Sequence, residues 1–303
     1  MSRPSLSAAS MKDIFAFVGN LQAEMNRLQC QAEELSPFVS ESIEKCALLE
    51  GMSVVDVGCG TGQVSFLFSS TVGPTGRVIG IDTNTTAIKL CRKTASTKEV
   101  KNVSFIVGSA CDLSRDLPDN SVDVAYSRFL LTHLEDPVAA ISEMIRMTTR
   151  KGMIMIEDCD LTHWIVEPND RWVNQLWKWY SSIIRKKGGD PTLGRKLYRM
   201  FLDQGLNPTV DAYSLPVTGI NHNIWNSIIG VLKEIDETRN TEDPLNIESS
   251  GNSYGSQEFI EPREETQLPF KLRDLVNGLS RFSQRESSLF VFPLIFRVWA
   301  RKI

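Results

Sequence analysis

The sequence lacks the features of several protein classes. Its six cysteines include no C-x-x-C pair, which favours reduced, buried thiols in a cytosolic protein. A net charge of −4 argues against binding to nucleic-acid phosphates as the main task. No apolar run reaches the ~18 residues of a membrane span, and the first residues lack the apolar core of a secretory signal. We expect a cytoplasmic protein with no membrane span, nucleic-acid partner or metal.

A glycine-rich stretch organises the rest of the chain. Apolar β-branched residues lead into Asp56, which is followed by Gly58, Gly60 and Gly62 and then by an apolar segment of helical character. This order predicts a strand, a tight loop and a helix N-terminus. Because glycine has no Cβ and tolerates positive φ, such a loop lets the backbone approach a ligand closely. In doubly wound sheets, ligands bind at this point, outside the carboxyl ends of the strands.

Strands and helices alternate between residues 51 and 160. The expected strands are Ser53–Val57, Arg77–Ile81, Val103–Val107, Val122–Tyr126 and Met153–Glu157, and the expected helices between them are 62–72, 84–97 and 136–150. Such alternation implies a parallel sheet with right-handed crossovers. Apolar residues at helical spacing also predict one or two helices before the first strand.

The alternation breaks after Asp160. Two helices rich in large aromatic residues are expected there, followed by a strand, two further helices and a final strand over Leu289–Arg301. The expected organisation is an N-terminal helical lid (1–50), a ligand-binding core (51–160), a helical insertion (161–206) and C-terminal strands and helices that complete the sheet (207–303), with a polar loop near 239–267.

The glycine spacing narrows the choice of ligand. A dinucleotide fingerprint requires G-x-G-x-x-G, whereas this loop is G-x-G-x-G and has Gln63 where the third glycine is needed. Asp82 ends the second strand, where a carboxylate can accept hydrogen bonds from both ribose hydroxyls. The pattern favours a ribose-bearing ligand without a pyrophosphate, and it makes a dehydrogenase the least expected class.

Five motifs occur in the order of a known family. They are Val54–Gly62, Gly80–Asp82, Gly108–Ala110, Leu117–Asp123 and His133–Pro137. Together they resemble class I S-adenosylmethionine-dependent methyltransferases, specifically the small-molecule group that includes ubiquinone and menaquinone C-methyltransferases. The resemblance covers residues 30–160 closely and the remainder loosely. It implies a doubly wound, Rossmann-like α/β fold with N-terminal helices, a seven-stranded sheet ending in a reversed hairpin, and a helical substrate cover after the fifth strand.

The resemblance also implies contacts to S-adenosylmethionine as cofactor. The glycine loop lies against the methionine part, Asp56 holds the loop or the ammonium group, and Asp82 takes the ribose hydroxyls. The other expected contacts are Gln31 on a lid helix, Thr83 beside the ribose site, Ser109, Ala110 and Cys111 at the adenine, and Ser127 and Arg128 on the sulfonium side. Many relatives have Asp where Ser109 stands, and Asp112 is an alternative acceptor here.

The reaction depends above all on how the methyl donor and the acceptor atom are positioned, because methyl transfer is an in-line displacement. A hydroxyl or acidic carbon acceptor also loses a proton, for which histidine is a usual base. Some natural-product O-methyltransferases that this chain resembles use a histidine at the position of His133 with an acid at the end of the fifth strand, here Glu157 or Asp158. The alternative is that His133 only caps or packs against the helix that starts near Asp136.

The aromatic insertion is the expected substrate cover. His163, Trp164 and Trp177 are expected to line the substrate pocket, although aromatic residues at helical spacing are more often core. An aromatic cover excludes water and suits a planar or apolar substrate. Residues 127–130 do not form the (D/N)PP(Y/F) loop of enzymes that methylate adenine or glutamine nitrogen.

We therefore expect methyl transfer to an oxygen or carbon atom, and less readily to nitrogen, of a small aromatic or apolar metabolite. Secondary metabolism is the expected setting, and the protein is expected to be a monomer or homodimer. Two alternatives stay open. One is a methyltransferase-like protein that binds S-adenosylmethionine and catalyses a cyclisation or rearrangement without methyl transfer, and the other is a non-catalytic binding subunit.

Overall fold

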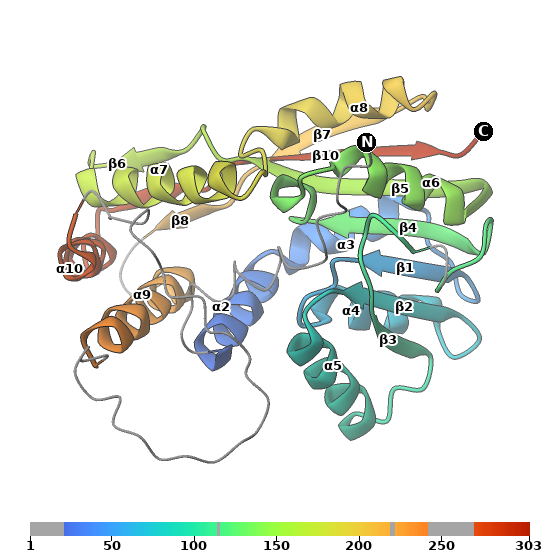
Figure 1. The fold of residues 1–303 in the computed structure, drawn as a ribbon, viewed down its shortest axis with the longest axis horizontal. Helices are drawn as coiled ribbons and strands as arrows, with labels where there is room; N and C mark the ends of the chain where they lie inside the picture. Colours follow the sequence, from blue (N-terminus) through green and yellow to red (C-terminus); the bar gives the residue numbers. More distant parts are fainter. Residues whose placement is uncertain (1–20, 114–115, 219–221, 242–269) are drawn as a thin grey trace, which may run out of the picture.

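The computed structural model describes residues 21–113, 116–218, 222–241 and 270–303 of the protein (Figure 1). Residues 1–20 of the expected N-terminal helical lid and most of the expected polar loop near 239–267 lie outside this part of the chain. No helix within the described residues is both long and apolar enough to cross a membrane.

A seven-stranded sheet forms the centre of the molecule, with the strand order β3-β2-β1-β4-β5-β10-β7. The first five strands in this order pair in parallel, and β10 runs antiparallel to both of its neighbours. The expected seven-stranded sheet with a reversed last hairpin is therefore confirmed. The strands are β1 (Ser53–Val57), β2 (Arg77–Asp82), β3 (Val103–Val107), β4 (Val122–Arg128), β5 (Thr148–Asp160), β7 (Thr209–Tyr213) and β10 (Leu294–Arg301).

Helices cover both faces of this sheet, because its strands present apolar residues on both sides. Val54 packs with one helical layer and its neighbour Val55 with the other, as the alternation of side chains along a strand requires. One layer contains α3 (Ser36–Lys45), α4 (Gln63–Val72) and α5 (Thr85–Thr97), and the other contains α6 (Pro137–Met147) and α8 (Leu197–Asp203).

Local sequence signals set the helix starts that the motifs predict. The side chain of Asn84 accepts hydrogen bonds from the backbone N–H groups of Thr86 and Ala87 at 3.0 and 3.1 Å and so caps α5. Asp136 accepts from the N–H of Ala139 at 2.9 Å and caps α6, whose first residue is a proline. These caps fix the directions in which the chain leaves β2 and β4.

Another cluster of apolar residues is carried by helices and short strands that lie beyond the carboxyl ends of the parallel strands (Figure 1). It joins the long helices to a small antiparallel sheet of order β6-β9-β8. The residues expected to form one strand over 289–301 are divided between β9 and β10, because Phe292 and Pro293 interrupt the pairing. The elements are β6 (Ile165–Glu167), α7 (Arg171–Lys186), β8 (Pro216–Thr218), α9 (Asn223–Thr241), α10 (Leu272–Ser283) and β9 (Leu289–Val291).

Candidate functional site

A cavity of about 370 Å³ opens at the carboxyl ends of the parallel strands. Its walls come from the glycine loop after β1, from the ends of β2, β4 and β5, and from α2 (Leu21–Glu34), α7 and α9. Figure 1 shows α2 and α9 side by side at this edge of the sheet, where they pack against each other. The position is the one that the first crossover of a doubly wound sheet offers to a ligand.

The glycine loop has the backbone conformation that its spacing predicts. Gly58, Gly60 and Gly62 all have positive φ, at +77°, +53° and +78°. A Cβ at Gly60 would meet no heavy atom within 4 Å, whereas a Cβ at Gly58 would lie 2.9 Å from Leu130 and one at Gly62 2.9 Å from Phe105. Gly58 and Gly60 line the cavity, so the open space beside Gly60 is available to a ligand, while Gly62 is constrained by packing.

Two buried carboxylates lie beside the loop. Asp82 accepts a hydrogen bond from the N–H of Gly60 at 2.9 Å and another from the N–H of Asn84 at 2.8 Å. Asp56 accepts from the hydroxyl of Ser65 at 2.6 Å, and its burial raises its pKa to about 6. Burial also raises the pKa of Asp82. Both carboxylates line the cavity, but only Asp82 binds the loop itself, whereas Asp56 binds the first turn of α4.

Arg128, at the end of β4, also lines the cavity. Its Nη1 atom is buried and has no hydrogen-bond partner within the described residues. The charge of Arg128 lowers the pKa of Asp56, although the burial of Asp56 outweighs this effect. A buried guanidinium N–H without a partner is unfavourable in the free protein, and it would be satisfied by an anionic group of a ligand.

A short 3₁₀ helix, η1 (Leu131–His133), follows β4 in the chain and contacts the end of β5 through hydrogen bonds. The Thr132 backbone N–H and hydroxyl donate to the fully buried carboxylate of Asp158 at 2.9 and 2.5 Å. Burial raises the pKa of Asp158 to about 6, so the group is mostly ionised at neutral pH. Thr132, His133 and Asp158 all line the cavity.

His133 does not form the expected hydrogen-bonded pair with a carboxylate. Its Nδ1 is buried and has no hydrogen-bond partner among the residues described, and Asp158 binds Thr132 instead. Burial, together with the smaller effect of the nearby charges of Arg27 and Lys187, lowers the pKa of His133 to about 4. The imidazole is therefore neutral at physiological pH. Its ring meets that of Tyr180 edge to face, with 6.3 Å between centroids.

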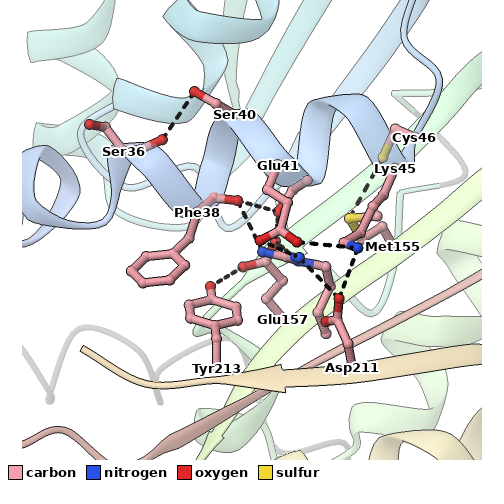
Figure 2. A network of polar contacts seen from close by, with 12 residues as sticks. Ser36, Phe38, Ser40, Glu41, Lys45, Cys46, Met155, Glu157, Asp211 and Tyr213 are labelled. Atoms are coloured by element: carbon pink, nitrogen blue, oxygen red, sulfur yellow. Dashed lines mark hydrogen bonds and ion pairs between the residues drawn. The ribbon is translucent and has the colours of Figure 1, made fainter. Parts of the chain in front are cut away.

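Glu157 does not face the cavity, because adjacent residues of a strand point to opposite faces of the sheet. Its carboxylate lies under α3 instead (Figure 2). There it accepts hydrogen bonds from the hydroxyls of Ser42 and Tyr213, and from that of Tyr126 at 3.2 Å. The Nε of Arg297 lies 3.3 Å from the same carboxylate, and both charged side chains are fully buried. Of the two acids expected at the end of β5, only Asp158 lines the cavity.

The Glu157–Arg297 pair anchors α3 to the sheet. Arg297 donates to the backbone carbonyl of Phe38 in α3 at 3.0 Å, and its Nη1 lies 3.2 Å from Glu41 and 3.3 Å from Asp211. Lys45 bridges the same two acids at 3.3 and 3.0 Å. Breaking a buried ion pair from one side is strongly destabilising. We therefore interpret this cluster as structural support for the helix that follows α2.

Several of the expected site residues lie outside the cavity lining. On the cofactor side these are Gly62, Thr83, Ser109, Ala110, Cys111 and Ser127. On the substrate side, His163 is exposed and its Nδ1 lies 2.8 Å from Arg195 Nη2, while Trp164 donates to Asn174 at 2.8 Å. Gln31, on α2, does line the cavity and accepts from Arg27 at 3.2 Å. Contacts of the outlying residues to a cofactor or substrate stay predictions.

Trp177 of α7 lines the cavity, as expected, and stacks on Phe290 with 5.6 Å between ring centroids and an interplanar angle of 9°. Thr132 and the lining residues of α9 were not predicted from the sequence. The helical spacing of apolar residues in α9 was visible, but no local signal showed what the helix would face. The order of the motifs also gave no indication that Thr132 would bind Asp158.

Comparison with known proteins identifies the family. A family model described as a methyltransferase domain matches residues 48–205, just over half of the chain. The chain belongs to this methyltransferase family. The expected class I S-adenosylmethionine-dependent methyltransferase, with its Rossmann-like fold, is thereby confirmed. The matched residues contain the glycine loop and the two strands β4 and β5, whose ends line the cavity.

Curated relatives of the methyltransferase match it over part of their length. An uncharacterised methyltransferase of Schizosaccharomyces pombe is 33% identical over 156 residues, which are 50% of this chain and 55% of the relative. A demethylmenaquinone methyltransferase of Listeria monocytogenes is 30% identical over 118 residues, which are 39% of this chain and 49% of the relative. The chain thus spans about half the length of these relatives.

Solved structures support the fold. The YcgJ protein from Bacillus subtilis is 20% identical and superposes with a TM-score of 0.54 over 88% of this chain and 98% of its own. The [4+2]-cyclase SpnF is 16% identical, with a TM-score of 0.51 over 89% of this chain and 82% of its own. At these identities the likeness concerns the fold and not the reaction.

Proposed function

We propose that this methyltransferase transfers a methyl group from S-adenosylmethionine to an oxygen or carbon atom of a small aromatic or apolar metabolite. The observation that carries the proposal is that one cavity joins the glycine loop and Asp82 to Asp158 and to a largely apolar wall. A cofactor held at the loop and an acceptor held by the wall would therefore meet beside a carboxylate that can take a proton.

The residues of the polar end fit the charged and polar parts of S-adenosylmethionine. The cofactor's ribose hydroxyls would donate to Asp82, and its ammonium group would lie near Asp56. The unpartnered Nη1 of Arg128 fits the carboxylate of the methionine part better than the sulfonium, because a guanidinium and a sulfonium repel each other. The open space at Gly60 leaves room for the methionine chain to lie against the backbone.

Asp158 is the group that we assign to proton transfer. S-adenosylmethionine supplies an electrophilic methyl group on a positively charged sulfur. The acceptor oxygen or carbon would form its bond to that methyl carbon while the bond between the methyl carbon and sulfur breaks and S-adenosylhomocysteine leaves. The acceptor's proton would pass to a carboxylate oxygen of Asp158, which is ionised at neutral pH. Thr132 holds the carboxylate in place through two hydrogen bonds. His133, neutral and beside Tyr180, orients the acceptor and excludes water.

Mass spectrometry tests the proposal. The protein is incubated with S-adenosylmethionine carrying a deuterated methyl group and with a panel of phenols, enols, hydroxyquinones and amines. We expect a product that gains the labelled methyl group on oxygen or carbon, with an equal amount of S-adenosylhomocysteine, and we expect Asp158→Asn to slow its formation. An isomerised product of unchanged mass would support the cyclisation alternative, and labelled methylamines alone would exclude the O- or C-acceptor.

A further inference from the structure

The cavity changes character along the edge of the sheet. The strand order β2-β1-β4-β5-β10 places Asp82, the glycine loop, His133, Asp158 and the start of β10 in sequence along this edge. Asp56, Asp82 and the backbone polar groups of the loop therefore lie at the β1–β2 end, and the other charged lining residues are Arg27 of α2, Arg128 and Asp158. Past Asp158 the wall is made by α7, α9 and the segment that leads into β10, whose lining side chains are mainly aliphatic and aromatic.

Helix α9 contributes a continuous apolar stripe to this wall. Ile224, Ile228, Val231 and Ile235 lie at positions i, i+4, i+7 and i+11, which share one face of a helix, and all four line the cavity. The charged side chains that the structure describes on α9 are absent from the lining, and Lys233 is exposed on another face of the helix.

Opposite α9, the wall is equally apolar. Leu176, Trp177 and Ile183 of α7 line it, together with Phe292. Trp177 contacts both Phe290 and Phe292, with ring centroids 5.6 and 5.7 Å away, and these two rings contact each other at 5.0 Å. Burial of a hydrocarbon against such an apolar wall is favourable, whereas burial of a charge that has no partner there is unfavourable.

We infer that the methyl acceptor is an uncharged molecule whose hydrocarbon body lies between α7 and α9, and that the apolar stripe of α9 selects it. The reacting hydroxyl or acidic C–H bond sits at one end of this molecule, beside Asp158. Phosphorylated metabolites, amino acids and nucleotides are excluded as acceptors, because each would place a charge against the stripe. The inference rests on the proposed function and names the acceptor class of that same cavity.

A matched pair of fluorescent probes tests the charge requirement. N-phenyl-1-naphthylamine is uncharged, and 8-anilino-1-naphthalenesulfonate is the same aromatic amine with a sulfonate. We expect the uncharged probe to bind to the protein saturably and on the order of tenfold more tightly than the sulfonate, because the sulfonate must be buried without a partner. Equal or tighter binding of the sulfonate would overturn the inference.

Two variants of α9 locate the probe. Ile228→Trp fills the cavity from the stripe and is expected to weaken binding of N-phenyl-1-naphthylamine by about tenfold. Lys233→Trp adds the same side chain to the exposed face of the same helix and is expected to leave probe binding unchanged. Equal effects of the two variants, or no effect of Ile228→Trp, would overturn the role of the stripe.

Calorimetric titration of the same samples with S-adenosylmethionine distinguishes a failure of the proposed function from a failure of the inference about the acceptor. Because the stripe lies away from the glycine loop, we expect Ile228→Trp to bind the cofactor with wild-type affinity, which also shows that the variant is folded. If the wild type binds the uncharged probe as expected but does not bind S-adenosylmethionine, the proposed function fails while the apolar site stands. If it binds the cofactor but not the probe, the inference fails and the proposed function stands.

Discussion

The conformation of Gly60 allows the cofactor site to be tested with a single methyl group. Gly60 has a φ of +53°, and a Cβ added there would meet no heavy atom within 4 Å. An alanine in the left-handed region costs about 1–2 kcal/mol. Because nothing inside the protein clashes, we expect Gly60→Ala to lower the free energy of unfolding by only this amount. The new methyl group would nevertheless occupy space that we assign to the methionine part of the cofactor.

Gly205 provides the matched control. It follows α8, has a φ of +77°, and also has no heavy atom within 4 Å of an added Cβ, but it does not line the cavity. Gly205→Ala should therefore lower the free energy of unfolding by the same ~1–2 kcal/mol. The two variants carry the same chemical change and the same backbone strain, and they differ in whether the methyl group reaches the cavity.

Calorimetry on the folded proteins gives the decisive comparison. We expect Gly60→Ala to weaken S-adenosylmethionine binding by tenfold or more, equivalent to at least about 1.4 kcal/mol. Gly205→Ala should bind with wild-type affinity, and urea unfolding of both variants measures the shared loss of stability. Wild-type affinity in Gly60→Ala, or the same loss of affinity in Gly205→Ala, would refute the placement of the cofactor against this loop.

Three further predictions concern the charged groups. Glu157→Gln should lower the free energy of unfolding, measured in urea, by about 3 kcal/mol, because it breaks the buried pair with Arg297. A variant of unchanged stability but weaker cofactor binding would contradict the interpretation that Glu157 supports α3. The pKa of Asp158 is raised to about 6, so its charged form destabilises the folded state as the pH rises from 4 to 7. The stability of Asp158→Asn relative to wild type should therefore increase by up to about 3 kcal/mol over that range, and a flat difference in urea unfolding would refute the shift. Arg128→Gln should weaken the binding of S-adenosylmethionine about tenfold in the same calorimetric assay. Its affinity for 5′-methylthioadenosine, which has no carboxylate, should be unchanged. Equal losses of affinity for both ligands would show that Arg128 does not bind the carboxylate.

The sequence predicted the polar end of the site well because that end is local. Gly58 and Gly60 follow β1 directly and Asp82 ends β2, so the spacing of a few residues and the parallel order of the strands bring them together. The helix caps at Asn84 and Asp136 are likewise local signals, and both helices begin where they indicate.

The choice between Glu157 and Asp158 could not be made from sequence. Both faces of the sheet are covered by helices, so the apolar run before these residues does not show which face each side chain takes. The partners of Glu157 come from distant parts of the chain, namely Ser42, Tyr126, Tyr213 and Arg297. Only the three-dimensional structure separates a structural carboxylate from one that faces the cavity.

The contribution of α9 to the apolar end of the site could not be predicted from the sequence, for the same reason. The stripe of Ile224, Ile228 and Val231 predicts a buried helix face, but its partner is set by the packing of α9 against α2 and α10. The run over residues 289–301 looks like one strand, yet its two halves join different sheets. Such choices depend on contacts between segments far apart in the chain, which local periodicity does not encode.

A crystal structure of the protein with S-adenosylhomocysteine would test the central claim most directly. The account predicts that the ribose hydroxyls donate to Asp82, that the amino-acid part lies over Gly60 with its carboxylate at Arg128, and that the sulfur faces the space beside Asp158. A nucleoside bound away from Asp82, or a sulfur directed away from the apolar wall between α7 and α9, would contradict it.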